Sequence, residues 1–184
     1  MKLIITFGLI SSHCFAFGQI KLPTKQEVEK VIKLAISQKM TDKNISCSYG
    51  QCGEWWTANS DSIFYKSDII KFYNSSNIVY SNPTFCTSVV WDFDKKDVFY
   101  SSEANMCQEP PTRSLKAGAF LSGNDAVKIP NRYKVLLKNN QAYIVTYVDQ
   151  VVYETFKVIE LRKTTQSNLG DESFVLTLVR QKQS

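Results

Sequence analysis

Histidine is almost absent from this chain. His13 is the only one, and it lies within residues 1–18, which have the three parts of a secretory signal. Lys2 gives the basic start, an apolar run follows to Ile10, and Ala16-Phe17-Gly18 is the small-residue end. Cleavage near Gly18 leaves a mature chain without imidazole, which excludes Ser–His and Cys–His nucleophile pairs and His-ligated zinc. We therefore expect a secreted or periplasmic protein.

Long apolar runs and the usual catalytic motifs are also missing. The apolar run of the signal is shorter than the ~20 residues that a membrane-spanning helix needs, and no later run is longer. There is no glycine-rich phosphate loop, no G-x-S-x-G elbow and no acidic calcium loop. Two acid pairs, Glu54 with Asp61 and Asp92 with Asp94, have the chemistry to flank a glycosidic bond, but we favour ordinary solvated acids. The sequence predicts no enzyme, no cofactor, no metal and no membrane span.

The charge is modest and mixed. Lys and Arg number 22 against 17 Asp and Glu, so the formal charge is +5, and it falls to +4 when Lys2 leaves with the signal. Basic residues are interspersed with acidic ones along the chain. A surface of this kind argues against nucleic acid or an anionic membrane as a partner.

Four cysteines remain after Cys14 leaves with the signal: Cys47, Cys52, Cys86 and Cys107. Three pairings are open, and the short loops favour Cys47 with Cys52 and Cys86 with Cys107. A four-cysteine zinc site is the alternative, but the spacing lacks the C-x2-C knuckle and export favours disulfides.

The stretch between Cys86 and Cys107 is typical of a β-hairpin. TSVVWDFD and VFYSSEA flank a turn at residues 94–97, and apolar and polar side chains alternate in the first of these runs. Pairing around Lys96 places Cys86 opposite Cys107 or one step from it, at a spacing that suits a disulfide. We expect this hairpin to be a fixed point of the fold.

A helix is predicted over residues 24–40. Thr24 followed by Glu27 is the capping-box pattern, and Val28, Val31, Ile32 and Ala35 recur at helical spacing.

From Glu54 onward the pattern favours strands. Short runs rich in β-branched and aromatic residues alternate with Asn, Ser, Asp and Pro. Outside the 86–107 hairpin these runs lie at 63–65, 68–73, 78–80, 133–138, 143–148, 153–161 and 173–180. Asn139-Asn140-Gln141 is a turn between two of them, and the long connection 108–131 is a candidate lid. We predict one mainly β domain over residues 19–184, an antiparallel up-and-down meander or barrel of about eight strands, with one amphipathic helix before it.

Aromatic side chains are the remaining lead to a binding site. The chain has 23, of which 20 follow residue 18. Tyr and Trp line pockets and interfaces because they bury large areas and keep a hydrogen-bonding group, although they also fill β cores. The pocket candidates are Trp55, Trp56, Trp91, Tyr133 and Tyr147. Since neighbouring residues of a strand point to opposite faces, we expect Trp55 or Trp56 to lie at a barrel mouth or on an interaction surface.

The order of these features resembles a known family. A helix, then Gly53-Glu54-Trp55-Trp56, an Ile-x-Phe run, a Trp-x-Phe hairpin, FKVIEL and a closing FVLTLVR are similar to the lipocalin-like (calycin) small exported bacterial proteins, over residues 53–181. The resemblance implies a β-barrel. We therefore predict an exported, non-catalytic binding protein that holds a small apolar ligand or a partner protein with its aromatic-rich barrel. The alternative is an exported inhibitor or immunity-type protein, which blocks another protein through its disulfide-fixed loops.

Overall fold

The structure is a computed structural model that describes residues 21–41, 53–74, 82–117, 131–148, 150–164 and 173–182. The predicted signal, the Cys47 and Cys52 pair and the predicted strand at 78–80 lie outside these residues. Residues 118–130 of the predicted lid lie outside them as well.

The described residues are mainly β, as the sequence predicted. They contain the helices α1 (Lys25–Thr41) and α2 (Ile63–Lys66) and nine strands. The strands are β1 (Trp55–Ala58), β2 (Ile69–Asn74), β3 (Thr87–Phe93), β4 (Phe99–Asn105), β5 (Thr112–Ala117), β6 (Arg132–Lys138), β7 (Gln141–Val148), β8 (Val151–Thr164) and β9 (Ser173–Gln181). All nine form one antiparallel sheet in the order β5-β4-β3-β1-β2-β9-β8-β7-β6.

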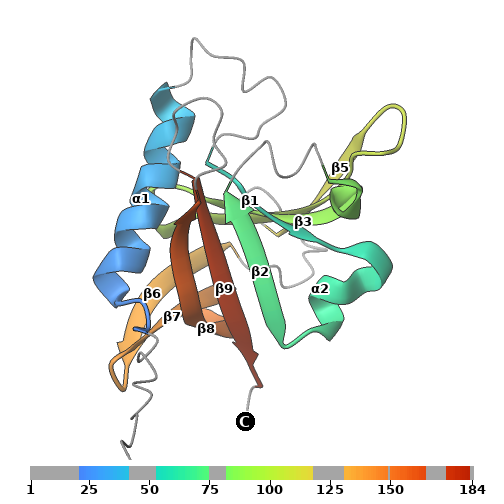
Figure 1. The fold of residues 1–184 in the computed structure, drawn as a ribbon. Coiled ribbons are helices and arrows are strands. Elements are labelled where there is room, and N and C mark those ends of the chain that lie inside the picture. The colour runs from blue at the N-terminus through green and yellow to red at the C-terminus, as the bar shows by residue number, and fades with distance from the viewer. Residues whose placement is uncertain are drawn as a thin grey trace, which may run out of the picture.

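The predicted up-and-down meander and barrel are wrong. Two meanders, β3–β4–β5 and β6–β7–β8–β9, are joined through β1 and β2, so β1 lies between β2 and β3. The sheet curls until its two halves meet at one corner, where Val98 bridges Arg132 and the Phe99 amide donates to the Asn131 carbonyl at 3.1 Å. It does not close into a barrel, and α1 lies against its inner face, where it contacts β3, β6 and β7 (Figure 1).

Helix α1 spans Lys25–Thr41, where the sequence predicted 24–40. The Thr24 amide and hydroxyl donate to Glu27 Oε2 at 2.7 and 2.8 Å, and the Glu27 amide donates back to Thr24 Oγ1 at 3.2 Å. This is the reciprocal capping box that the pattern indicated. Val28, Val31, Ile32 and Ala35 are buried against the sheet.

The main core lies between α1, α2 and the inner face of the sheet. Trp91 is at its centre, with five aromatic rings at centroid distances of 4.4–6.2 Å, from Phe64, Phe72, Phe93, Phe99 and Phe156. Most of these pairs are edge-to-face, which is the arrangement that aromatic quadrupoles favour. The other face of β1, β3 and β4 carries a smaller apolar cluster around Trp56, Phe85, Val90 and Ala104.

Residues Ile63 to Tyr65, predicted as a strand, instead begin α2. Asp61 and Ser62 have left-handed backbones, with φ of 53° and 60°, and they reverse the chain before it can extend. Asn59 Oδ1 then accepts from the Phe64 amide at 3.2 Å. Tertiary contacts override the β propensity of this run because burial of Phe64 in the core requires the turn.

Both predicted hairpins are confirmed. The β3–β4 hairpin pairs Thr87 with Asn105, and the Cys86–Cys107 disulfide closes its open end with a Cα–Cα distance of 5.0 Å. The β6–β7 turn has Asn139 and Asn140 at φ of 50° and 58°, as a type I′ turn requires. Part of the predicted lid is also ordinary sheet, since β5 pairs with β4.

No helix among the described residues is both long and apolar enough to cross a membrane.

Candidate functional site

The five predicted pocket aromatics do not form one site. Trp55, Trp91 and Tyr133 belong to the main core, and the Trp91 and Tyr133 rings both contact Phe93. Burial raises the pKa of Tyr133 to about 12, with a smaller contribution from nearby carboxylates. Tyr147 is half-buried, and the Lys134 ammonium lies 5.6 Å from its ring centroid. These side chains are therefore placed to pack the protein.

Trp55 and Trp56 point to opposite faces of β1, yet both are buried. The sequence analysis expected one of them at a barrel mouth or on an interaction surface. Instead the outer face has its own apolar cover, in which the Arg113 guanidinium lies 6.0 Å from the Trp56 ring centroid. Arg113 is held there by an ion pair with buried Glu54 at 2.9 Å and by a bond from Nε to Ser102 Oγ at 2.7 Å.

Glu54 and Asp61, one of the candidate acid pairs, lie in different environments. Glu54 is buried against Arg113, whereas Asp61 is exposed in the turn before α2. No group of three or more His, Cys, Asp or Glu side chains in the described part of the chain is arranged to hold a metal ion. The best candidate site is therefore elsewhere, at the side of α1.

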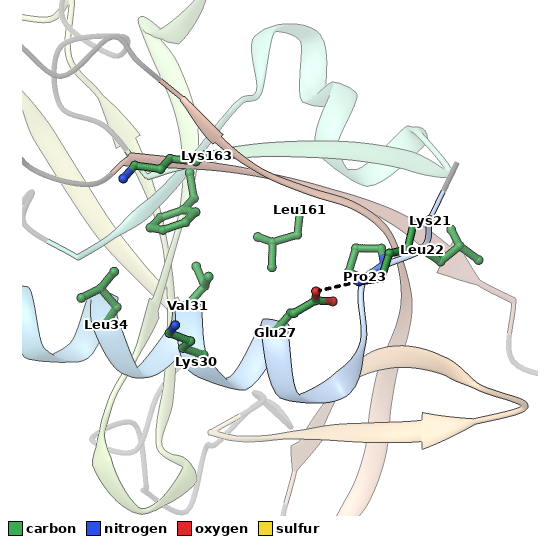
Figure 2. Close-up of a pocket in the computed structure, with 10 residues that line it drawn as sticks. Lys21, Leu22, Pro23, Glu27, Lys30, Val31, Leu34, Leu161 and Lys163 are labelled. Atoms are coloured by element: carbon green, nitrogen blue, oxygen red, sulfur yellow. Dashed lines mark hydrogen bonds and ion pairs between the residues drawn. The ribbon is translucent and has the colours of Figure 1, made fainter. Parts of the chain in front are cut away.

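A groove with a cavity volume of about 410 Å³ runs between the first half of α1 and strands β8 and β9 (Figure 2). Its floor and walls are mostly apolar and its rim is charged. The apolar lining comes from Leu22, Pro23, Val31, Leu34, Leu161 and Phe174, and the charged lining from Lys21, Glu27, Lys30 and Lys163.

A β-bulge in β8 places two of the lining residues, Leu161 and Lys163, on the face of the sheet that α1 covers. Val158 pairs with Leu178, but Glu160 pairs with Thr177, so one extra residue is inserted between them. The insertion changes the alternation of faces, and Leu161 then lies opposite Leu176 and Lys163 opposite Phe174. Without it, Glu160 and Arg162 would take the inner positions and the groove would lose its apolar wall.

The α1 side of the groove is built by the start of the helix. Pro23 precedes the Thr24 cap and brings Leu22 and Lys21 alongside the first turn. Val31 and Leu34 follow one and two turns later; Leu34 lies beside the buried stripe and is only half-buried. That extra apolar residue at the edge of the stripe is the signal from which sequence reasoning could have found the groove.

The charges of the groove are unevenly distributed. Glu27 accepts from Thr24 and lies 3.4 Å from Lys21 Nζ. The bond from the Thr24 amide is the main reason why the pKa of Glu27 is lowered, so this carboxylate is ionised at neutral pH. Figure 2 shows Glu27, Lys21 and Pro23 at one end, and Lys30, Lys163 and Leu34 toward the other. Among the described residues that line the groove, the charged ones are three lysines and one glutamate.

The described lining residues suit binding, because the charged side chains among them are lysines and one carboxylate that is already engaged by a helix cap. Comparison with family models, curated proteins and solved structures finds no match to this chain. The lipocalin-like resemblance therefore stays a prediction.

Proposed function

We propose that this protein is an exported, non-catalytic binding protein that holds a small, mainly apolar molecule in the groove between α1 and strands β8 and β9. The observation that carries the proposal is a concave, mainly apolar groove with a volume of about 410 Å³ between α1 and strands β8 and β9. Small-molecule sites are concave and mostly apolar, with volumes of ~300 to 1,000 Å³ and a few polar groups that orient the ligand.

The groove suits this role better than the inner face of the sheet. There Trp91 is already surrounded by five rings, so the aromatic residues are in contact with one another. The groove side chains Leu34, Leu161 and Phe174 are only partly buried. A ligand that covers them gains about 25 cal/mol for each Å² of apolar surface removed from water.

A neutral apolar fluorophore tests the proposal directly. Residues 19–184, exported and oxidised, are titrated with N-phenyl-1-naphthylamine, and we expect saturable binding with enhanced fluorescence. Leu34→Ser, which makes the groove wall polar, should weaken binding about fivefold to tenfold, because a buried leucine contact contributes ~1 to 1.5 kcal/mol.

The matched control is Leu137→Ser, on the edge strand β6, where the leucine is 57% exposed. This variant should bind the fluorophore as the parent does. The proposal is wrong if binding does not saturate, or if both variants lose affinity equally.

The inhibitor or immunity-type alternative is favoured by a different surface. Ile63, Tyr65 and Ile69 are 50%, 49% and 62% exposed on and beside α2. The turn that presents them is fixed by the left-handed residues Asp61 and Ser62. A rigid loop with exposed apolar side chains loses little conformational entropy when it fills another protein's cleft.

A double variant of the surface around α2 distinguishes the two proposed functions. Ile63→Asp combined with Ile69→Asp should leave fluorophore binding unchanged and should remove any complex with an exported partner, as measured by reconstitution with the purified partner. A complex that survives the double variant would exclude this surface.

A further inference from the structure

Lysines and tyrosines lie together on the outer face of strands β6, β7 and β8, across the sheet from α1 and the groove. Alternate residues of these strands, among them Val135, Ile144 and Phe156, belong to the main core on the inner face. The residues between them therefore point outward. The outward residues that we call the lysine–tyrosine face are Lys134, Leu136, Lys138, Tyr143, Tyr147 and Lys157.

The lysine–tyrosine face carries charge of one sign. Strands β6 and β7 contain no acidic residue. Of the two glutamates of β8, Glu154 lies on the inner side with Arg180, and Glu160 is paired with Arg162 at 2.9 Å. None of the three lysines of the face forms an ion pair with a carboxylate in the described part of the chain. The charge of the whole sequence is mixed, but this face is locally positive.

The three lysines are spread across the face. Lys134 and Lys138 lie on β6 with Leu136 midway between them. Lys157, two strands away, is in the same row as Leu136 and Tyr143. With a rise of ~3.4 Å per residue and ~4.8 Å between strands, the three backbone positions are ~12 to 14 Å from one another. A single small anion does not span such distances, whereas a polymer with repeated acidic groups does.

The tyrosines of the face distinguish between kinds of anionic polymer. The Lys134 ammonium lies 5.6 Å from the ring centroid of Tyr147, and both tyrosines of the face are half-buried. Single-stranded nucleic acids bind by stacking their bases on aromatic faces, and the Tyr147 ring is already engaged by a cation. A tyrosine hydroxyl both donates and accepts hydrogen bonds, so it suits the hydroxyl groups of a sugar.

From this arrangement we infer that the lysine–tyrosine face binds an anionic polysaccharide. The polymer lies flat across β6, β7 and β8. Its sulfate or carboxylate groups contact the three lysines, and its hydroxyl groups contact Tyr143 and Tyr147. Binding releases the counterions condensed on the polymer, so affinity falls as salt rises. The inference does not depend on the function proposed for the groove, because the groove lies on the other side of the sheet.

Five probes test the charge and the class of the ligand. Dextran sulfate, polygalacturonate, neutral dextran, a thymidine oligonucleotide and vesicles that contain phosphatidylglycerol are titrated calorimetrically with the mature, oxidised protein at low salt. Both charged polysaccharides should bind, and added salt should weaken them. Neutral dextran should not bind, and the oligonucleotide and the vesicles should bind at least about tenfold more weakly than either charged polysaccharide.

Lysine variants locate the site. Lys138→Gln combined with Lys157→Gln should reduce affinity for either charged polysaccharide about fivefold to thirtyfold, the range for two partly exposed ion pairs. The slope of log affinity against log salt should fall by about one for each lysine removed. Lys138→Arg combined with Lys157→Arg keeps the charge and should bind as the parent does.

The matched control is Lys25→Gln combined with Lys33→Gln. It removes the same net charge from two lysines of α1 that do not line the groove. This variant should change polysaccharide affinity by less than about twofold. Both glutamine variants should match the parent in the free energy of unfolding and in fluorophore binding, so that a loss of polysaccharide binding is not a loss of folding.

Several results would overturn the inference. Equal losses in the two glutamine variants would mean that net charge alone attracts the polymer. Neutral dextran binding as tightly as dextran sulfate, or the oligonucleotide or the vesicles binding more tightly than both charged polysaccharides, would contradict it as well, and so would the absence of binding by either charged polysaccharide. Preference for dextran sulfate identifies sulfated sugars, and preference for polygalacturonate identifies uronic acids; either result supports an anionic polysaccharide.

Discussion

The two helices lie against the same face of the sheet but are attached to it in different ways. Helix α1 has 17 residues and buries a stripe of four apolar side chains. Helix α2 has four residues and buries only Phe64. It is held instead by Arg180, whose guanidinium donates to the Phe64 and Tyr65 carbonyls at 3.0 Å each, and by the bond from the Tyr65 hydroxyl to Glu103 at 2.6 Å.

The different attachment of the two helices explains why a groove forms beside α1 and not beside α2. Hydrogen bonds and ion pairs are directional, so α2 is fixed against its neighbours by its polar contacts. Apolar burial is non-directional, and the stripe of α1 is narrower than the helix is wide. The side of α1 that faces β8 and β9 is therefore only partly covered, and the groove forms there.

Removal of the single apolar anchor of α2 should have the largest effect. Phe64→Ala is expected to reduce the free energy of unfolding by about 3 to 5 kcal/mol, because it leaves a cavity beside Trp91 and Phe72. Val28→Ala on α1 removes a smaller side chain from a shared stripe and should cost about 2 kcal/mol. Urea denaturation of the oxidised protein measures both. Equal losses would contradict the view that α2 has one anchor.

Removal of the polar contacts that hold α2 should have the second-largest effect on the free energy of unfolding. Arg180→Met keeps an unbranched apolar stem but removes the guanidinium, whose carbon lies 5.0 and 5.6 Å from the Phe64 and Phe156 ring centroids. The two bonds to carbonyls and the ion pair with Glu154 at 3.3 Å are lost with it. The expected cost is about 2 to 3 kcal/mol.

Arg180→Met should change hydrogen exchange at α2 as well as the free energy of unfolding of the whole protein. Hydrogen exchange should speed up at the α2 amides and stay unchanged at α1. Arg162→Met is the matched control, since its ion pair with Glu160 at 2.9 Å is exposed, and it should change stability by no more than about 0.5 kcal/mol. Faster exchange at α1 in the Arg180 variant would show that the two helices are not attached independently.

The features that the sequence predicts correctly are those set by nearby residues. The Thr24 and Glu27 spacing indicated the cap of α1, the alternation around Trp91 indicated β3, and the Asn139-Asn140 pair indicated a turn. Each depends on residues a few positions apart, so local sequence carries the information. The Cys86–Cys107 disulfide belongs to this group because it spans a single hairpin.

The features that the sequence does not predict are those determined by residues far apart in the chain. The Ile63-Phe64-Tyr65 run has strand composition, and it is helical partly because Arg180, 115 or more residues later, binds its carbonyls. The predicted barrel was wrong because closure depends on pairing between the edge strands, which strand counting does not detect; the sheet stays open, and α1 contacts β3, β6 and β7. The groove was missed because the bulge after Val158 reverses which residues of β8 face inward. The three-residue spacing of Val158 and Leu161 is a local trace of the bulge, as Leu34 at the edge of the α1 stripe is a local trace of the groove.

The smallest expected effect is at the cap of α1. Glutamine can still close a capping box, so Glu27→Gln should cost only about 0.5 kcal/mol at neutral pH, from the loss of a negative charge at the helix start. The pKa of Glu27 is lowered below its ordinary value of 4.5 in the folded protein. The contribution of the carboxylate is therefore present above pH 4.5 and is lost as pH falls through the folded pKa.

The stability difference between the parent and Glu27→Gln should accordingly close below pH 4.5, which urea denaturation at several pH values measures. A difference that persists in acid would mean that the hydrogen bonds, and not the charge, distinguish the two.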